Sequence, residues 1–288
     1  YRLVRALLGE RKSLFAVGDD DQAIYGFRGA DIGNILRFRK DFPTSTLIRL
    51  EWNYRSVPQV LYLANRIFTD KPPLLRKVLR AGNRRQDELF LENREPEFWE
   101  SEKAIEEIGK ISMRIREMRK VYELKYSDFC ILVRYNRQRE YYEMALREVG
   151  IPLACDSEEG VQVMTVHASK GLQFLVVFYA GLAEGLTPGT CEGNRKKRKN
   201  QLAEERRLFY VGVTRAEAVL VLLYCKERFW KGRKVQFRPS RFLDCLEQPL
   251  QGSNMPLLLF KIRVVILALA YMAYAIFQIT FRRIFFRE

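Results

Sequence analysis

Short apolar runs alternate with helical patterns along most of the chain, and this alternation constrains the fold more than any other feature. Runs typical of strands lie at 13–18, 45–52, 129–134, 160–167, 174–182 and 218–224. Patterns typical of helices lie at 32–42, 57–68, 100–120, 136–150 and 202–216. Because several of these strands are apolar throughout, both faces of their sheet must be covered. The sequence therefore predicts an α/β fold, a parallel sheet with helices on both faces.

Polar stretches separate these elements. Residues 70–98 are rich in proline, arginine and asparagine and are expected to form an irregular connection. The basic run at 195–199 is expected to be a solvated loop rather than a DNA contact or a localisation signal. Asn136 is the expected N-cap of the helix that follows it, and Gly150 its expected stop.

The charge balance favours a polyanionic partner. Lysine and arginine number 50 against 35 aspartates and glutamates, which gives a net charge of +15. Nucleic acid, nucleotide or an acidic membrane surface would suit such a chain, and a solvated basic surface is the plainer alternative. The five cysteines lie far apart and the chain has a single histidine. We therefore expect no metal site and a reducing compartment.

The stretch "FAVGDDDQAIYGFRGAD" places many polar groups after an apolar run. Ligands of parallel sheets bind beyond the carboxyl ends of the strands, which is where this cluster is expected. Gln22 could orient a water molecule or contact a terminal phosphate, and Arg28 suits a phosphate. Tyr25 and Phe27 alternate and could stack on bases. An acidic turn with core aromatics is the alternative.

Three further segments carry polar groups at the ends of elements. In "NYRS", Tyr54 could stack on a nucleobase and Arg55 could reach a phosphate from a neighbouring element. In "TVHASKGLQF", Thr165 and His167 alternate, and Gly171 allows a close backbone approach; a lone histidine after a strand is more often structural. These two segments are weak signals individually.

The last of these segments is "EERRLFYVGVTRA", in which Arg215 follows an apolar helix face. Its plainer interpretation is a helix-ending arginine bonded to carbonyls.

Together, and in this order, the segments resemble the later motifs of superfamily 1 DNA helicases of the UvrD/Rep type. "VGDDDQAIYGFRGA" is similar to the third motif of that family, "LEWNYRS" to the fourth, "VMTVHASKGLQF" to the fifth and "EERRLFYVGVTRA" to the sixth. "GLAEGLTP" is similar to the segment that follows the fifth motif. The resemblance covers residues 15–224.

The resemblance implies a P-loop NTPase helicase architecture, in which two RecA-like domains clamp ATP while single-stranded DNA crosses both. Gln22 would sense the γ-phosphate and Arg28 would support it. Tyr54 would stack on adenine, while Arg55 and Arg215 would act as catalytic arginine fingers.

Further site residues follow from the same resemblance. Gly171 and Gln173 would contact the nucleotide, with Gln173 near the ribose. The DNA path would be lined by Tyr25, Phe27, Thr165 and His167. The implied function is an ATP-dependent 3′ to 5′ helicase or translocase acting on single-stranded and duplex DNA, with this chain as its C-terminal motor half. Residues 1–56 would be the end of the first RecA-like domain and 57–245 the second.

The chain departs from the family pattern in three places. It contains no G-x-x-x-x-G-K-[ST] segment. The phosphate loop and the acidic Mg²⁺ ligands are expected before Tyr1, in an N-terminally truncated protein that is inactive on its own. Gln173 stands where the family has glutamate, so weaker nucleotide contact is expected. Only residues 154–160 stand where the family inserts an accessory domain.

The C-terminal tail is the last distinctive feature. Residues 264–281 contain no charge, within a hydrophobic tail at 256–286. At about 1.5 Å per residue this stretch nearly spans a bilayer core, so it is a candidate transmembrane helix. A buried or aggregating tail is the alternative. The competing functions are thus a helicase remnant that binds DNA or nucleotide without turnover, and a membrane-associated interaction protein.

Overall fold

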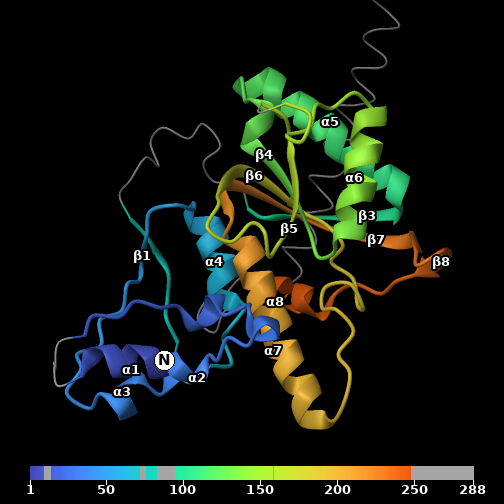
Figure 1. Ribbon diagram of the computed structural model, residues 1–288. Helices are drawn as coiled ribbons and strands as arrows, with labels where there is room; N and C mark the ends of the chain where they lie inside the picture. The colour runs from blue at the N-terminus through green and yellow to red at the C-terminus, as the bar shows by residue number, and fades with distance from the viewer. Residues whose placement is uncertain (10–13, 72–75, 83–94, 158, 248–288) are drawn as a thin grey trace, which may run out of the picture. The chain divides into compact units, whose positions relative to one another are not determined.

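A mostly parallel sheet forms the centre of the structure, a computed structural model that describes residues 1–9, 14–71, 76–82, 95–157 and 159–247 (Figure 1). The parallel strands run in the order β3 (Glu97–Lys103), β7 (Ala216–Trp230), β6 (Phe174–Tyr179), β4 (Phe129–Val133) and β5 (Gln162–Thr165). The hairpin strand β8 (Arg233–Gln236) pairs with β7 in antiparallel fashion. The predicted parallel α/β sheet, of the RecA-like type, is confirmed.

The helices vary in length and position. The longer ones are α4 (Pro58–Arg66), α5 (Ala104–Tyr122), α6 (Asn136–Glu148) and α7 (Arg195–Val213). The shorter ones are α1 (Arg2–Leu8), α2 (Gly33–Leu36), α3 (Phe38–Asp41) and α8 (Asp244–Glu247), with helical turns η1 (Asp20–Gln22), η2 (Gly26–Arg28), η4 (Tyr126–Asp128) and η5 (Arg241–Leu243). Residues Tyr1–Leu243 form one compact unit, and α8 begins a second.

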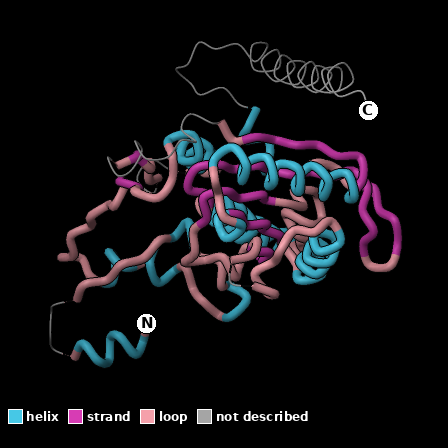
Figure 2. The backbone as a smooth tube through the Cα atoms, turned by 90° about the horizontal axis from the view of Figure 1, so that it is seen from above, coloured by secondary structure: helices cyan, strands magenta, loops and turns pink. Residues whose placement is uncertain are grey.

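Helices cover both faces of the sheet. Phe178 and Tyr179 are neighbours in β6 and therefore point to opposite faces. The ring of Phe178 lies 6.0 Å from that of Trp99, over which Arg114 of α5 stacks. The ring of Tyr179 lies 5.6 Å from that of Phe209 in α7. Helices α5 and α7 thus lie on opposite sides of the sheet, and Figure 2 shows helices on both sides of the strands.

Gly212 lets α7 approach the sheet closely. A Cβ atom at this position would lie 2.4 Å from the ring of Tyr179, so a side chain there would push the helix away. The last turns of α7 are fully buried as a result. Helix α7 ends at Val213, two residues before Arg215, and β7 begins at Ala216.

Two predicted strands near the N-terminus are wrong. Residues 14–18 have no regular secondary structure, and of 45–52 only Trp52 enters the short strand β1 (Trp52–Asn53), which pairs with β2 (Arg80–Ala81). Phe15 and Val17 are 89% and 75% exposed. A strand needs a neighbour for its backbone groups, and no described segment pairs with 14–18. The boundary at residue 56 stays a prediction.

Other predicted bounds shift. The basic run 195–199 is wrong as a loop, because it forms the first turns of α7. The irregular stretch 70–98 ends earlier than expected, since β3 begins at Glu97. The helix predicted at 32–42 is divided into α2 and α3. Asn136 is the first residue of α6 and Tyr135 its cap, whereas Gly150 has the positive φ of 73° expected of a helix stop.

No helix in the described ranges is long and apolar enough to cross a membrane. The candidate transmembrane stretch 264–281 lies outside those ranges, so that expectation stays a prediction.

A buried ion pair joins α5 to β7. Glu107 is fully buried and Arg228 is 6% exposed. Nη2 of Arg228 donates to both carboxylate oxygens of Glu107, at 2.7 and 2.6 Å, and Tyr142 of α6 donates to the same carboxylate. Removing one partner of such a pair leaves the other charge buried without compensation.

We therefore expect Glu107→Gln to lower the free energy of unfolding by about 3–5 kcal/mol. Urea denaturation would measure the change. Asp156→Asn is the control, because it breaks the ion pair with Arg147, in which both side chains are about half exposed, and should leave the midpoint nearly unchanged. Equal midpoints for the two variants would contradict the expectation.

Candidate functional site

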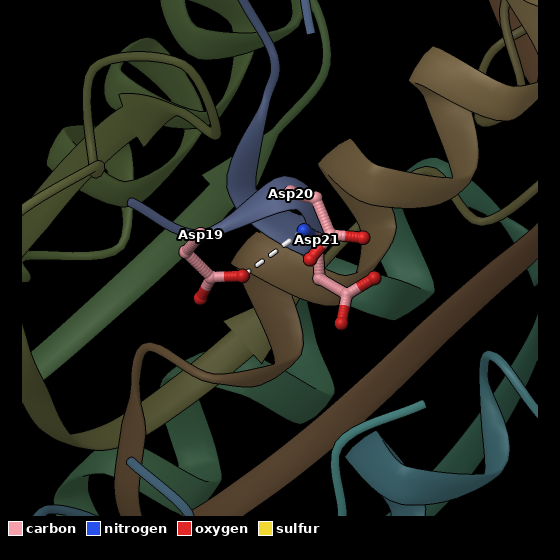
Figure 3. A group of neighbouring side chains, drawn as sticks. All are labelled: Asp19, Asp20 and Asp21. Carbon is pink, nitrogen blue, oxygen red and sulfur yellow. Dashed lines mark hydrogen bonds between the residues drawn. The ribbon is translucent and has the colours of Figure 1, made fainter. Parts of the chain in front are cut away.

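Three carboxylates gather at the turn that follows residues 14–18. Carboxylate oxygens of Asp19, Asp20 and Asp21 lie within 4.8 Å of one another (Figure 3). The backbone N–H of Asp21 donates to Asp19 Oδ1 at 3.0 Å, which begins the helical turn η1. The side-chain amide of Gln22 donates to Asp19 Oδ2 at 2.8 Å. Gln22, predicted to sense a phosphate, is thus held against this turn.

Two lysines form ion pairs with all three carboxylates of the acidic turn. Nζ of Lys71 lies 2.7 Å from Asp20 Oδ2 and also pairs with Asp21. Nζ of Lys77 pairs with Asp19 and lies 3.4 Å from Asp21 Oδ2. Burial opposes the charge of Lys71, but its hydrogen bonds to the aspartates raise its pKa overall. Because these carboxylates are occupied by ammonium groups, they do not fit a Mg²⁺ ion.

Arg55 lies where the segment after β1 meets the start of β6. Its Nε donates to Gln173 Oε1 at 2.9 Å, and its Nη1 donates to the Thr214 carbonyl at 3.2 Å. Its Nη2 makes no hydrogen bond to any described residue. The Asn53 side chain accepts from the backbone N–H of Arg55, which fixes the turn. The predicted residues Arg55 and Gln173 are therefore in direct contact.

Arg215 lies directly beneath this pair and is almost fully buried. Its Nε donates to Val211 O at 3.0 Å and its Nη1 to Leu172 O at 2.8 Å. Burial, and then the positive charge of Arg55, lower the pKa of Arg215 to about 10. Burial also lowers the pKa of Arg55, and the negative charge of Glu217 opposes that shift, whereas no carboxylate contributes to the shift of Arg215. In this structure Arg215 is therefore an arginine bonded to backbone carbonyls, which is the plainer of the two expectations.

Two more predicted residues lie near the arginines along the chain. Tyr54 is 60% exposed, and a Cβ atom added to Gly82 would lie 2.2 Å from its ring. Gly171 lies in the loop between β5 and β6 and has a φ of 95°, a conformation that favours glycine. Lys170 beside it donates to Gln22 O at 2.8 Å. That contact joins the loop to the acidic turn.

Tyr25, Phe27 and His167 form one ring cluster. The Phe27 and His167 rings meet edge to face with centroids 5.3 Å apart, and Tyr25 lies 6.2 Å from Phe27 and 6.4 Å from His167. Phe27 is 65% exposed, so the cluster faces solvent. Thr165 ends β5 beside it and accepts from Ala168 N at 3.3 Å. The structure brings together three of the four residues predicted to line a DNA path, with the fourth nearby in sequence.

Arg28 belongs to this ring cluster rather than to the arginine pair. Its guanidinium carbon lies 5.3 Å from the Tyr25 ring centroid and 5.5 Å from that of Phe27. No hydrogen bond among the described residues joins Arg28 to Gln22 or Arg55.

Helix α7 holds the segment that carries the ring cluster. Glu204 Oε1 accepts from Gly26 N at 2.8 Å, and Arg207 Nε donates to Ala23 O at 2.6 Å. Sequence reasoning missed these two contacts and those of Lys71 and Lys77. Glu204 and Arg207 are three residues apart and share a helix face, which is a signal that could have found them. The two lysines lie in polar stretches with no comparable signal.

His167 provides a direct probe of the ring cluster. Burial lowers its pKa below the ordinary 6.5, and the positive charge of Arg134 lowers it further. Because it is the single histidine of the chain, its imidazole signals in a proton NMR spectrum need no assignment. We expect a titration midpoint below 6.5 in the folded protein and the ordinary value after unfolding.

The unfolded state then binds more protons than the folded state below that pH, so the free energy of unfolding should fall as the pH drops through 6.5. A folded-state midpoint at or above 6.5 would show that the imidazole is not enclosed by its neighbours.

Comparison with known families gives two matches. The UvrD-like helicase C-terminal domain matches residues 48–159 and, in a second segment, 153–227. The UvrD/REP helicase N-terminal domain matches residues 1–43. The two C-terminal segments meet at the place where the sequence lacks the expected accessory domain.

Several curated proteins are similar to the chain. A probable DNA helicase of Mycoplasma pneumoniae is 30% identical over 249 residues, which cover 86% of this chain and 44% of that protein. The ATP-dependent DNA helicase PcrA of Leuconostoc citreum is 34% identical over 152 residues, 53% of this chain and 19% of that protein. The ATP-dependent DNA helicase UvrD2 of Mycobacterium tuberculosis is 26% identical over 352 aligned positions, 88% of this chain and 49% of that protein.

The chain thus spans less than half the length of these relatives. The C-terminal family match alone covers more than half of the chain. The resemblance expected from the motifs is confirmed, and the chain belongs to the UvrD-like helicase family.

Proposed function

We propose that this chain serves in the ATP-driven motor of a 3′ to 5′ DNA helicase, where it reads the terminal phosphate of ATP and guides a DNA strand. The observation that carries the proposal is the arginine pair beside Gln173. Two guanidinium groups lie close enough for one to lower the pKa of the other. No carboxylate contributes to the pKa shift of Arg215, and the negative charge of Glu217 acts on Arg55 only in part, because burial still lowers the pKa of Arg55 overall. An anion would satisfy such a pair, and a phosphate suits it best.

Arg55 would make the direct contact with the phosphate, because its Nη2 is available. Arg215 lies behind it and supplies positive charge from a desolvated position, where charge acts more strongly than in water. For Arg215 to become a second finger, its Nη1 would leave the Leu172 carbonyl. Gln173, already bonded to Arg55, would bind the ribose or hold Arg55 in place.

The other residues predicted to bind the nucleotide differ in how well their positions suit that role. The exposed ring of Tyr54 would stack on adenine, and Gly171 would let the backbone approach the nucleotide. Gln22 would have to leave Asp19 to sense a γ-phosphate. Arg28 would reach the phosphates only by leaving the ring cluster, so its location supports a contact with DNA instead.

The ring cluster would guide the DNA strand. Tyr25, Phe27 and His167 would stack on bases, with Thr165 beside them contacting the backbone. Lys170 links this cluster to the nucleotide side, because its Nζ donates to Gln22 O and lies 5.0 Å from the Tyr25 ring centroid. A movement of Gln22 on phosphate binding could therefore be transmitted to the DNA strand through the loop that carries Lys170. The five free cysteines fit a reducing compartment, and the helicase role implies one that contains DNA, such as the cytoplasm.

A second candidate function is binding without turnover. The 288 residues contain no phosphate loop, and the described residues offer no acidic set free to bind Mg²⁺. Bound Mg²⁺ would supply charge stabilisation at the transferring phosphate. We therefore expect this chain alone to bind nucleotide and DNA without releasing phosphate.

The phosphate role predicts a selective loss in Arg55→Ala. ATP binding should weaken by about 1.5–3 kcal/mol, the value of a hydrogen bond to a charged group, while ADP binding changes little. Titration with fluorescent ATP and ADP analogues would measure both. Arg233→Ala removes an exposed cation at the start of β8 and is the matched control. Equal losses for ATP and ADP would contradict the contact with the terminal phosphate.

In any form of the protein that carries a phosphate loop, Arg55→Ala should lower ATP turnover about 1,000- to 100,000-fold, as loss of an arginine finger does, while DNA binding stays intact. Unchanged turnover in a phosphate-release assay would refute the finger role.

The strand role predicts that Phe27→Ala weakens binding of single-stranded DNA by about 1–3 kcal/mol, the value of one base-stacking contact. Phe229→Ala is the control, because Phe229 is 75% exposed at the far end of β7. Fluorescence anisotropy with a labelled oligonucleotide would compare them. The stacking role fails if both substitutions have the same effect.

A further inference from the structure

The first turns of α7 carry a run of cations that the proposed site does not use. Residues 195–199, "RKKRK", are all exposed, and Figure 1 shows this end of α7 extending beyond the sheet. The N-cap is Asn194, whose side chain accepts from Lys197 N, and no acidic residue occupies the first turn. Positive charge at a helix N-terminus is unfavourable because it repels the helix dipole. The run therefore does not serve to stabilise its own helix.

The acidic and amide side chains further along α7 are bonded elsewhere. Glu204 binds Gly26 N, and Glu205 pairs with Arg134 at 2.7 Å. Gln201 accepts from Glu192 N. None of the cations at 195–199 forms an ion pair with a described residue. The charge of this turn is thus available to an external polyanion.

The helix geometry separates the cations into two faces. At 3.6 residues per turn, Lys197 lies within about 20° of Glu204 around the helix axis, and Lys196 within about 20° of Arg207. Glu204 and Arg207 contact the segment that carries Tyr25 and Phe27. Lys196 and Lys197 therefore share the face of α7 that meets the ring cluster.

Two arginines of the same run lie on the opposite face of the helix. By the same geometry, Arg195 lies about 180° from Glu204, and Arg198 about 180° from Arg207. Arg195 and Arg198 therefore provide a control for the two lysines. They carry the same charge in the same part of the helix but lie on the opposite face.

We propose that Lys196 and Lys197 bind the phosphate backbone of a nucleic-acid strand that has left the ring cluster, a proposal that rests on the strand role above. The distance along the helix from Lys197 to Glu204 is about 10 Å, so the strand continues from stacked bases to the lysines over a short span. Lysine binds phosphate as a point charge without reading base identity. The contact extends the DNA path without adding sequence specificity.

The test compares two double variants of the full chain, Lys196→Gln with Lys197→Gln, and Arg195→Gln with Arg198→Gln. Both remove two positive charges from the same turn. Glutamine is as good a helix former as lysine, and the loss of cations there favours the helix, so neither variant should melt at a lower temperature. Circular dichroism would check this.

Binding is measured by fluorescence anisotropy against single strands of increasing length, over a range of salt concentrations. Loss of two phosphate contacts should reduce the slope of log affinity against log salt by about 1.4 on single strands. The lysine variant should show this loss on long strands and match the unsubstituted chain on the shortest strands that bind. The arginine variant should keep the original slope. A duplex with a single-stranded tail shows whether the phosphates belong to the single strand or to the duplex, and loss with either probe supports the proposal.

Four outcomes would overturn it. Equal slopes for the two variants would show a general electrostatic effect without a directed contact. Unchanged DNA binding together with weaker binding to anionic phospholipid vesicles in the lysine variant would assign the turn to a membrane surface. If the unsubstituted chain binds no DNA, the strand role fails first and this proposal with it; if that chain binds and the lysine variant is unaltered, only this proposal fails.

Discussion

The close approach of α7 to the sheet is the constraint on which the candidate site depends. Gly212 leaves no side chain between the helix and the ring of Tyr179, and the end of α7 is buried in consequence. That burial places Arg215 beneath Arg55 at the start of β7. The middle of the same helix holds the ring cluster through Glu204 and Arg207. One helix therefore fixes the arginine pair and the ring cluster relative to each other.

The arginine pair also explains why this place should bind an anion. A guanidinium buried without a carboxylate loses hydration that hydrogen bonds to carbonyls only partly replace. The lowered pKa of Arg215, about 10, reflects that loss and the repulsion from Arg55. The acidic turn is the opposite case, because Lys71 and Lys77 already compensate its charges. The negative charge at the turn is thus largely compensated by lysines, whereas the positive charge of the two arginines is not compensated by an ion pair of their own within the described residues.

The sequence was informative where local pattern and burial agree. The apolar run at 129–134 forms β4 (Phe129–Val133), whose five residues are all buried, and the motif residues Arg55 and Gln173, singled out separately, lie in contact. Local sequence pattern failed where the secondary structure of a segment depends on a neighbouring segment in the fold. An apolar run such as 14–18 forms a strand only beside another strand. The run 195–199 resembles a loop by its charge, yet lysine and arginine are good helix formers and Asn194 caps them.

The position of Arg28 and the ion pairs of Lys71 and Lys77 depend on the folded arrangement, and no spacing in the sequence encodes them. The most direct test of the account is a crystal structure of the chain with a non-hydrolysable ATP analogue and a short single strand. We predict the terminal phosphate within hydrogen-bond distance of Arg55 Nη2 and a base against the ring of Phe27. A nucleotide bound with its terminal phosphate away from Arg55 would contradict the central claim.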